Sequence, residues 1–213
     1  MKKYPQSLFA QTIATRLTNP KTIIDAPCGS GITTHILAQN FPAAKVIGAD
    51  LSKKNIAVAR RKFPAENLEF RVEDIHKLVA ETEKIDVFCL INSLFLLPEP
   101  AKLLRNISQK LTDSGRLFLI LPNPASTNFN RYQRIFPEVN TFILDPKDYV
   151  DFFVKTGFEI THCEGIARVP IYGRRDTKIL FPIRDRYLFW LESRSKSNDF
   201  GYFMLELKKR TYV

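Results

Sequence analysis

The stretch that decides the fold reads IIDAPCGSGITT and spans residues 23–34. Its apolar start belongs to a short strand over residues 21–26, and a helical pattern begins at Ile32. Gly29 and Gly31 lie between them, and glycine permits unusual backbone dihedrals and close approach of a ligand to the main chain. The first amides of the helix add positive potential. The stretch therefore predicts a strand, a glycine turn and a helix that border a ligand site.

Short apolar runs alternate with helical patterns along the rest of the chain, as in an open α/β sheet. Further strands are expected at residues 45–50, 68–74, 85–92 and 116–122, and helices at 6–17, 52–61, 100–111 and 146–156. Asp113, Ser114 and Gly115 predict the turn that ends helix 100–111.

The strands at 85–92 and 116–122 are almost continuously hydrophobic. Strands of this kind are covered on both faces by helices in a parallel sheet. The last two strands, at 158–169 and 201–210, have no clear crossover helix between them, which favours an antiparallel pair. We predict an α/β fold with a single doubly wound, mostly parallel sheet and helices on both faces.

The length of 213 residues suits one domain over residues 1–213, with an N-terminal helix within residues 1–20. Two long connections, at 123–144 and 170–200, do not fit the alternation of strands and helices. Connections of this length usually act as lids or binding segments, so both are expected to cover a substrate.

The net charge of +10 raises the local concentration of anions around the protein. Nucleic acid, acidic lipid surfaces and anionic metabolites are candidate partners, and a purely solubilising role for the surface lysines stays open. The basic residues are spread along the chain, whereas a dedicated nucleic-acid-binding tail would be more concentrated. Nucleic acid is therefore not the favoured partner.

The three cysteines, Cys28, Cys89 and Cys163, match neither a disulfide framework nor a zinc site, and no metal is expected. No apolar stretch approaches the roughly 18–20 residues that span a membrane. The N-terminus lacks the long apolar region and cleavage site of a signal peptide. We therefore expect a protein of the reducing cytoplasm.

Polar residues follow the strands at the edge where ligands of open α/β sheets bind. Asp50 ends the second strand, and a carboxylate there can accept hydrogen bonds from both hydroxyls of a ribose. Asp74 and Ile75 follow the third strand, and a carboxylate beside an apolar residue suits the amino group and flat face of adenine. Asn92 and Ser93 follow the fourth strand. Together they predict a nucleoside site.

The glycine turn argues against a dinucleotide. The dinucleotide fingerprint requires a third small residue, where this chain has Thr34. The carboxylate of Asp25 would repel a pyrophosphate, whereas it suits a ligand with an ammonium group, such as the methionine portion of S-adenosylmethionine.

The segment DAPCGSG at 25–31 resembles the glycine-rich first motif of class I, Rossmann-like S-adenosylmethionine-dependent methyltransferases of the small-molecule type. Asp50, Asp74 with Ile75, and the block at 92–122 are similar to the later motifs of that family, so the resemblance covers roughly residues 20–125. It implies a seven-stranded sheet of order 3-2-1-4-5-7-6 with the last strand antiparallel, and S-adenosylmethionine as cofactor. The cofactor-binding residues that it implies are Asp25, Ala26, Pro27, Gly29, Gly31, Asp50, Leu51, Asp74, Ile75, Asn92 and Ser93.

No residue stands out as a catalytic base. Phe95 and Leu96 occupy positions where related small-molecule enzymes often carry histidines. The histidines that the chain does have, His35, His76 and His162, are expected to be structural. In-line methyl transfer depends chiefly on alignment of the acceptor with the methyl group, and carboxylates and neutral amines need no base.

Substrate contacts are expected from the N-terminal helix and the two long connections, where aromatic rings could enclose an apolar acceptor and arginines could hold an anionic one. The candidates are Tyr4, Arg131, Tyr132, Tyr172, Arg184, Tyr187 and Trp190. The favoured interpretation is a methyltransferase with a small-molecule substrate. An RNA or protein methyltransferase, and a regulatory protein that binds the cofactor without turnover, remain alternatives.

Overall fold

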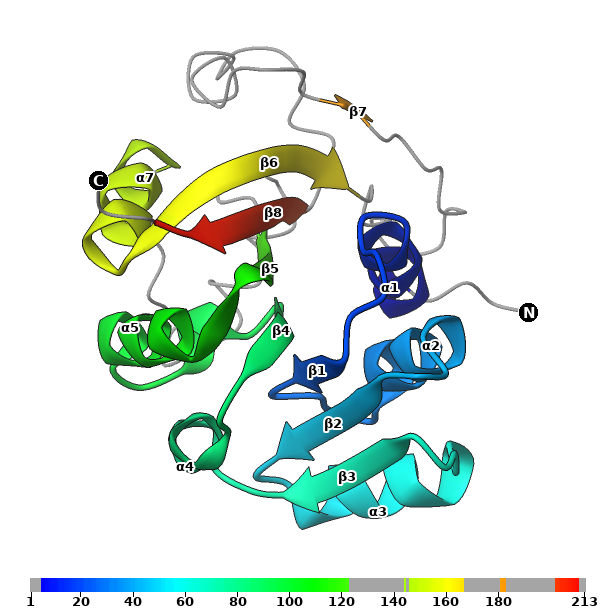
Figure 1. The fold of residues 1–213 in the computed structure, drawn as a ribbon. Helices are drawn as coiled ribbons and strands as arrows, with labels where there is room; N and C mark the ends of the chain where they lie inside the picture. Colours follow the sequence, from blue (N-terminus) through cyan, green and yellow to red (C-terminus); the bar gives the residue numbers. More distant parts are fainter. Residues whose placement is uncertain (1–4, 123–143, 145, 167–180, 183–201, 211–213) are drawn as a thin grey trace, which may run out of the picture.

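The computed structural model describes residues 5–122, 144, 146–166, 181–182 and 202–210 (Figure 1). The strands are β1 (Thr22–Asp25), β2 (Lys45–Asp50), β3 (Leu68–Val72), β4 (Ile85–Ile91), β5 (Leu111–Pro122), β6 (Phe158–Ile166), β7 (Phe181–Pro182) and β8 (Tyr202–Lys209). The helices are α1 (Pro5–Ala14), α2 (Ile32–Asn40), α3 (Lys53–Lys62), α4 (Ile75–Glu81), the short 3-10 helix η1 (Leu94–Leu96), α5 (Pro100–Lys110) and α7 (Pro146–Lys155).

These strands form one mixed sheet of order β3-β2-β1-β4-β5-β8-β6-β7. The first five strands pair in parallel, and β8 runs antiparallel to both β5 and β6. The predicted order 3-2-1-4-5-7-6 is therefore confirmed, with β8 as the seventh strand of that scheme. The two-residue β7 adds to the edge beside β6, within the connection that was expected to cover a substrate.

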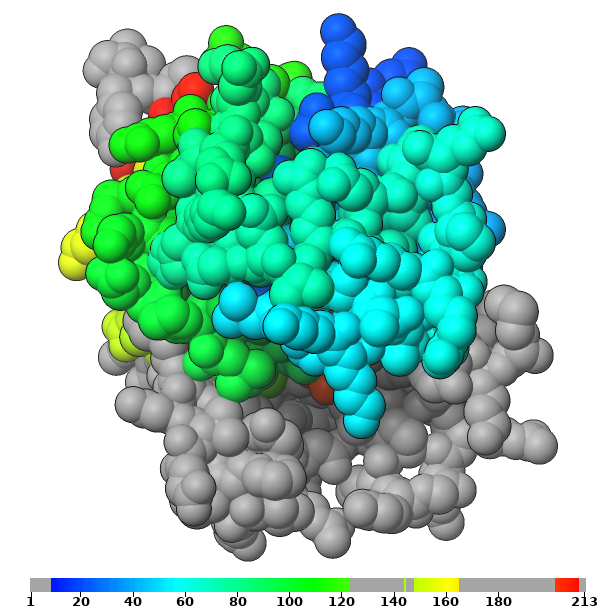
Figure 2. Space-filling model, turned by 90° about the horizontal axis from the view of Figure 1, so that it is seen from below, coloured from blue at the N-terminus to red at the C-terminus, as the bar shows by residue number. Residues whose placement is uncertain are grey.

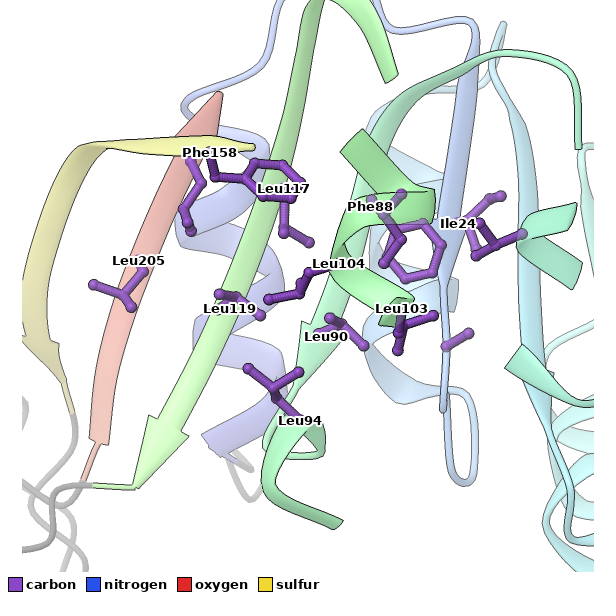
Figure 3. Packing of buried hydrophobic residues seen from close by; sticks show 14 of the residues in the cluster. Ile24, Phe88, Leu90, Leu94, Leu103, Leu104, Leu117, Leu119, Phe158 and Leu205 are labelled. Carbon is purple, nitrogen blue, oxygen red and sulfur yellow. The ribbon is translucent and has the colours of Figure 1, made fainter. Parts of the chain in front are cut away.

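Helices cover both faces of the sheet, as predicted. On one face, α4, α5 and α7 enclose a core in which Leu103 and Leu104 of α5 pack with Phe88 and Leu90 of β4 (Figure 3). On the other face, α1 and α2 pack over Val87 and other residues of a second core. Alternate residues of β4 thus enter opposite cores, which explains why the strand is hydrophobic at almost every position.

Two local predictions need correction. The short helix α4 was not predicted; Asp74 caps it, and Ile75, Leu78 and Val79 bury one face. The strand predicted at 116–122 begins earlier, at Leu111, directly after α5, and the turn predicted at 113–115 lies in a part of β5 that has no partner in β4. Residues 112–115 form an irregularity inside β5. Ile85 of β4 pairs with Leu111 and Val87 pairs with Arg116, so these four residues of β5 are extra relative to β4.

The described residues contain no helix with the length and hydrophobicity needed to cross a membrane. They also contain no group of three or more His, Cys, Asp or Glu side chains that could hold a metal ion.

Candidate functional site

A cavity of about 220 Å³ opens at the carboxyl edge of the sheet, between the β1–α2 turn, the end of β4, α1 and the start of β8. Ligand sites usually enclose roughly 300–1,000 Å³, so this cavity can hold part of a cofactor-sized molecule. It is lined by Phe9, Asp25, Pro27, Cys28, Gly29, Ser30, Ile32, Thr33, Ile91, Asn92 and Tyr202. The lining includes four of the predicted cofactor residues, Asp25, Pro27, Gly29 and Asn92.

The two glycines of the turn after β1 differ in the space around them. Both have positive φ, +54° at Gly29 and +80° at Gly31, which favours glycine at each position. A Cβ on Gly29 would have no atom within 4 Å, and Gly29 lines the cavity. A Cβ on Gly31 would lie 2.6 Å from the ring of Phe70. The main chain of Gly29 is therefore open on the side of its missing side chain, whereas Phe70 fills that space at Gly31. The approach of a ligand to Gly31 stays a prediction.

Asp25 places a buried carboxyl group at the cavity, with a side chain that is 1% exposed. The Thr34 hydroxyl donates a hydrogen bond to Oδ2 of Asp25 at 2.6 Å, while Oδ1 is buried without a hydrogen-bond partner. Burial raises the pKa of Asp25 from 3.8 to about 7, although the Thr34 hydrogen bonds oppose this shift. A cationic group beside Oδ1 would stabilise the ionised carboxylate.

Asp50 ties the end of β2 to the glycine turn. The main-chain N–H of Gly29 donates to Oδ2 of Asp50 at 2.8 Å, and the N–H of Ser52 donates to Oδ1 at 2.8 Å. The side-chain amide of Asn55 also donates to Oδ1, at 3.5 Å. A carboxylate has about four lone-pair positions, so about one further hydrogen bond can be accepted while all three of these are kept. Next to it, the side chain of Leu51 is 70% exposed, unusually high for a large apolar residue.

Asp74 and Ile75 have clear structural roles. Oδ1 of Asp74 accepts hydrogen bonds from the N–H groups of His76 and Lys77 at 2.8 and 3.1 Å, and so caps α4. Ile75 is 6% exposed and belongs to the core. These contacts leave their predicted adenine contacts untested.

Asn92 and Ser93 follow β4 at the same edge. Asn92 has a φ of +53°, lines the cavity and donates its main-chain N–H to the Ile120 carbonyl at 2.9 Å. Positive φ is uncommon outside glycine, and asparagine tolerates it better than most residues. The Ser93 hydroxyl is buried without a hydrogen-bond partner. Of the remaining predicted residues, Pro27 lines the cavity and Ala26 is buried in the core.

Several lining residues escaped the sequence reasoning. Phe9 of α1 and Tyr202 of β8 meet edge to face with ring centroids 5.8 Å apart, and close the cavity opposite the glycine turn. Phe9 lies in the predicted helix 6–17 and Tyr202 in the predicted strand 201–210, but nothing in the sequence placed their side chains together. Thr34 was noted only as a departure from a dinucleotide motif, although a polar residue at a buried helix position is a signal for a buried partner.

The predicted substrate residues, Tyr4, Arg131, Tyr132, Tyr172, Arg184, Tyr187 and Trp190, lie outside the described residues. Within the described lining of the cavity there is no histidine. His35 stacks on Phe63 at 4.5 Å, and Nε2 of His76 lies 3.3 Å from the Pro98 carbonyl. Nε2 of His162 lies 3.6 Å from Glu164.

The curated proteins that resemble this chain include methyltransferases of small molecules. Over 127 residues the chain is 28% identical to a trans-aconitate 2-methyltransferase of Variovorax paradoxus, which covers 59% of this chain and 48% of the relative. Over 138 residues it is 28% identical to a ubiquinone biosynthesis O-methyltransferase of Coxiella burnetii, covering 62% of this chain and 57% of the relative. The chain thus spans about half the length of these curated relatives.

A solved structure shares the fold. The plantazolicin methyltransferase BpumL, in complex with a triazolic desmethylPZN analogue and SAH, superimposes with a TM-score of 0.67 at 17% identity; the match covers 98% of this chain and 87% of that chain. Residues 17–156 match the family described as "Methyltransferase domain". The glycine turn, the acids that end β1 and β2, the strand order and this match lead to one conclusion: the chain belongs to the methyltransferase domain family, whose cofactor is S-adenosyl-L-methionine.

Proposed function

We propose that this chain transfers a methyl group from S-adenosylmethionine to a small-molecule acceptor at the carboxyl edge of the sheet. The observation that carries the proposal is the buried, unpartnered Oδ1 of Asp25 beside the open main chain of Gly29. A buried polar atom without a partner is costly, so a ligand with a matching donor explains its presence.

The donor set fits the cofactor. The ammonium group of the methionine portion complements Asp25, and Gly29 leaves room for that portion against the main chain. Asp50 accepts from the ribose hydroxyls at the lone-pair position that its main-chain hydrogen bonds leave available and at the one that the long contact from Asn55 occupies. Leu51, Asp74 and Ile75 are assigned to the adenine end, and the exposed side chain of Leu51 supplies an apolar surface for the base.

When bound, S-adenosylmethionine supplies a methyl group activated by its sulfonium. The chain's own contribution is orientation, because holding two reactants in line accelerates their reaction strongly. Asn92, held by its main-chain bond to Ile120, and the Phe9–Tyr202 wall limit where an acceptor can lie. No histidine lines the described part of the cavity, so an acceptor that needs no proton removal, such as a carboxylate or a neutral amine, suits it best.

Calorimetric titration with S-adenosylmethionine tests the cofactor assignment. Asp50→Ala should weaken binding by about tenfold or more, since it removes charge-assisted hydrogen bonds to the ribose. It should also destabilise the fold, because the Gly29 and Ser52 amides lose their acceptor.

Asp86→Ala is the matched control. Asp86 also accepts from two main-chain amides, those of Lys21 and Thr22, at the far end of the sheet. It should lower stability similarly and leave cofactor affinity unchanged. Equal loss of affinity in both variants would contradict the ribose role of Asp50.

Incubation with radiolabelled methyl donor and fractionated extract tests the acceptor class. Label in small metabolites supports the proposal, whereas label in RNA or protein would replace it with the polymer alternatives. Cofactor binding without transfer to any fraction would favour a regulatory protein. The cytoplasmic location stays a prediction, which cell fractionation can test.

A further inference from the structure

Helix α3 carries unusually concentrated positive charge. Its sequence KKNIAVARRK contains five basic residues and no acidic one. Lys53, Lys54 and Arg61 are exposed, and among the described residues none of them takes part in an ion pair. We call these three residues the basic stripe. Figure 2 shows α3, in cyan, at the surface of this end of the molecule.

The basic stripe lies on one face of the helix. Lys53, Ala57 and Arg61 follow one another at intervals of four residues, and such residues share a face. Lys54 lies seven residues before Arg61 and joins the same face. Lys53 and Arg61 are about 12 Å apart along the helix axis, at 1.5 Å per residue. The exposed Ala57 between them leaves room for a partner's side chains.

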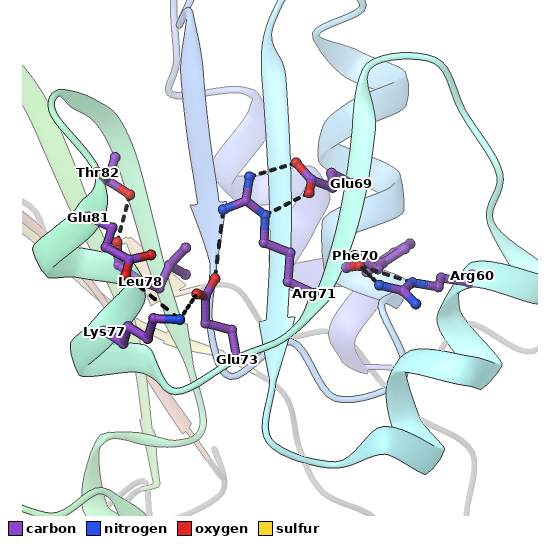
Figure 4. A network of polar contacts seen from close by, with 9 residues as sticks. All are labelled: Arg60, Glu69, Phe70, Arg71, Glu73, Lys77, Leu78, Glu81 and Thr82. Atoms are coloured by element: carbon purple, nitrogen blue, oxygen red, sulfur yellow. Dashed lines mark hydrogen bonds and ion pairs between the residues drawn. The ribbon is translucent and has the colours of Figure 1, made fainter.

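Helix stability does not explain this arrangement. The positive end of the helix dipole disfavours cations in the first turn, yet Lys53 and Lys54 occupy it and no acid accompanies them. Arg60 differs, because its guanidinium donates to the Phe70 carbonyl at 2.6 and 3.0 Å and so has a structural role (Figure 4). The stripe residues have no such contact among the interactions of the described chain.

Neighbouring charges, in contrast, are neutralised. At the edge strand β3 and α4, Arg71 pairs with Glu69 and Glu73, and Lys77 pairs with Glu73 and Glu81 (Figure 4). Glu69, Glu73 and Glu81 are thus paired on the α4 side, whereas no acid of the described residues forms an ion pair with the basic stripe.

We propose that the basic stripe of α3 docks an acidic protein surface. Carboxylates on one face of a partner helix, about 12 Å apart along its axis, match Lys53 and Arg61 in charge and in spacing. Exposed aromatic rings, on which single-stranded bases stack, are absent from the sequence of α3, so a single-stranded nucleic acid is less well matched. Ser52 caps α3 two residues after Asp50, so a docked protein would lie beside the cofactor edge.

The test measures binding of a fluorescein-labelled synthetic helical peptide with glutamate at every fourth position. The triple variant Lys53→Glu, Lys54→Glu, Arg61→Glu should weaken binding by about tenfold or more, since several modest charge contacts become repulsive. The control variant, Lys84→Glu, Arg105→Glu, Lys155→Glu, changes the same number of exposed lysines and arginines and the same net charge. It should change binding by less than about threefold.

Three results would overturn the proposal. The first is no saturable peptide binding by the unaltered chain, and the second is equal weakening by both triple variants. The third is tighter stripe-dependent binding of an oligouridylate or of phosphatidylglycerol vesicles, which would assign the surface to RNA or to a membrane. Both variants should retain S-adenosylmethionine affinity, so a failure of the docking proposal is separate from a failure of the proposed function.

Discussion

At the scale of single residues, the buried carboxyl group of Asp25 makes stability depend on pH. Below pH 3.8 the carboxyl group is protonated in the folded and the unfolded state, so it does not make the free energy of unfolding depend on pH. Between pH 3.8 and about 7 the unfolded chain ionises first, so rising pH destabilises the fold, by on the order of 4 kcal/mol at most. Above about pH 7 this penalty is complete and constant.

The difference in unfolding free energy between Asp25→Asn and the unaltered chain should therefore grow from pH 4 to 7 in favour of the variant. Urea denaturation at several pH values measures it. Asp151→Asn, at an exposed position of α7, serves as the control, and its unfolding free energy should differ from that of the unaltered chain by the same amount at each pH. A flat profile for Asp25→Asn would mean that Asp25 ionises normally in the folded chain.

The two glycines of the turn should respond differently to alanine. Gly31→Ala combines a positive φ with a Cβ 2.6 Å from the Phe70 ring, and should cost about 2–5 kcal/mol. Gly29→Ala has the backbone cost alone, about 1–2 kcal/mol. Chemical denaturation compares them, and Phe70→Leu should partly rescue Gly31→Ala. Equal losses would show that Phe70 does not fill the space above Gly31.

The sequence was sufficient to predict the position of site residues that lie at or shortly after the end of a strand. Asp25, Gly29, Asp50 and Asn92 lie at the predicted edge because strand ends set their positions. The contact of Phe70 with Gly31 could not be predicted, because it joins residues on different elements and depends on side-chain packing.

At the scale of elements, long periodic segments were predictable and short or irregular ones were not. The apolar run of β4 and the amphipathic α5 carry their own signal. Helix α4 has seven residues, too few for a clear period, and depends on its Asp74 cap and on packing. The sequence Asp113-Ser114-Gly115 has turn composition, and it lies between the β5 residues Leu111 and Arg116 that pair with β4, so the strand begins before the turn.

The irregularity in β5 gives a prediction of its own. A Cβ on Gly115 would lie 2.9 Å from the Thr112 carbonyl oxygen and 3.0 Å from that of Ile85. Gly115→Ala should therefore destabilise by about 1–3 kcal/mol, since backbone atoms must move. The neighbouring Ser114→Ala, at an exposed position, should stay within about 0.5 kcal/mol. Thermal and urea unfolding of the pair would test whether the strand is closely packed here.

At the scale of the whole molecule, one sheet connects both cores, and we propose that residues 1–213 form a single domain. Differential scanning calorimetry should then show one transition, with a calorimetric enthalpy equal to the van't Hoff enthalpy. Two resolved transitions would instead divide the chain into separately folding units.

The central claim is that the carboxyl edge of this sheet holds S-adenosylmethionine between two acids. A crystal structure of the chain with S-adenosylmethionine tests it most directly. The account predicts the ammonium group at Oδ1 of Asp25, the methionine portion against Gly29 and the ribose hydroxyls at Asp50. Cofactor bound elsewhere, or an empty cavity at saturating cofactor, would contradict it.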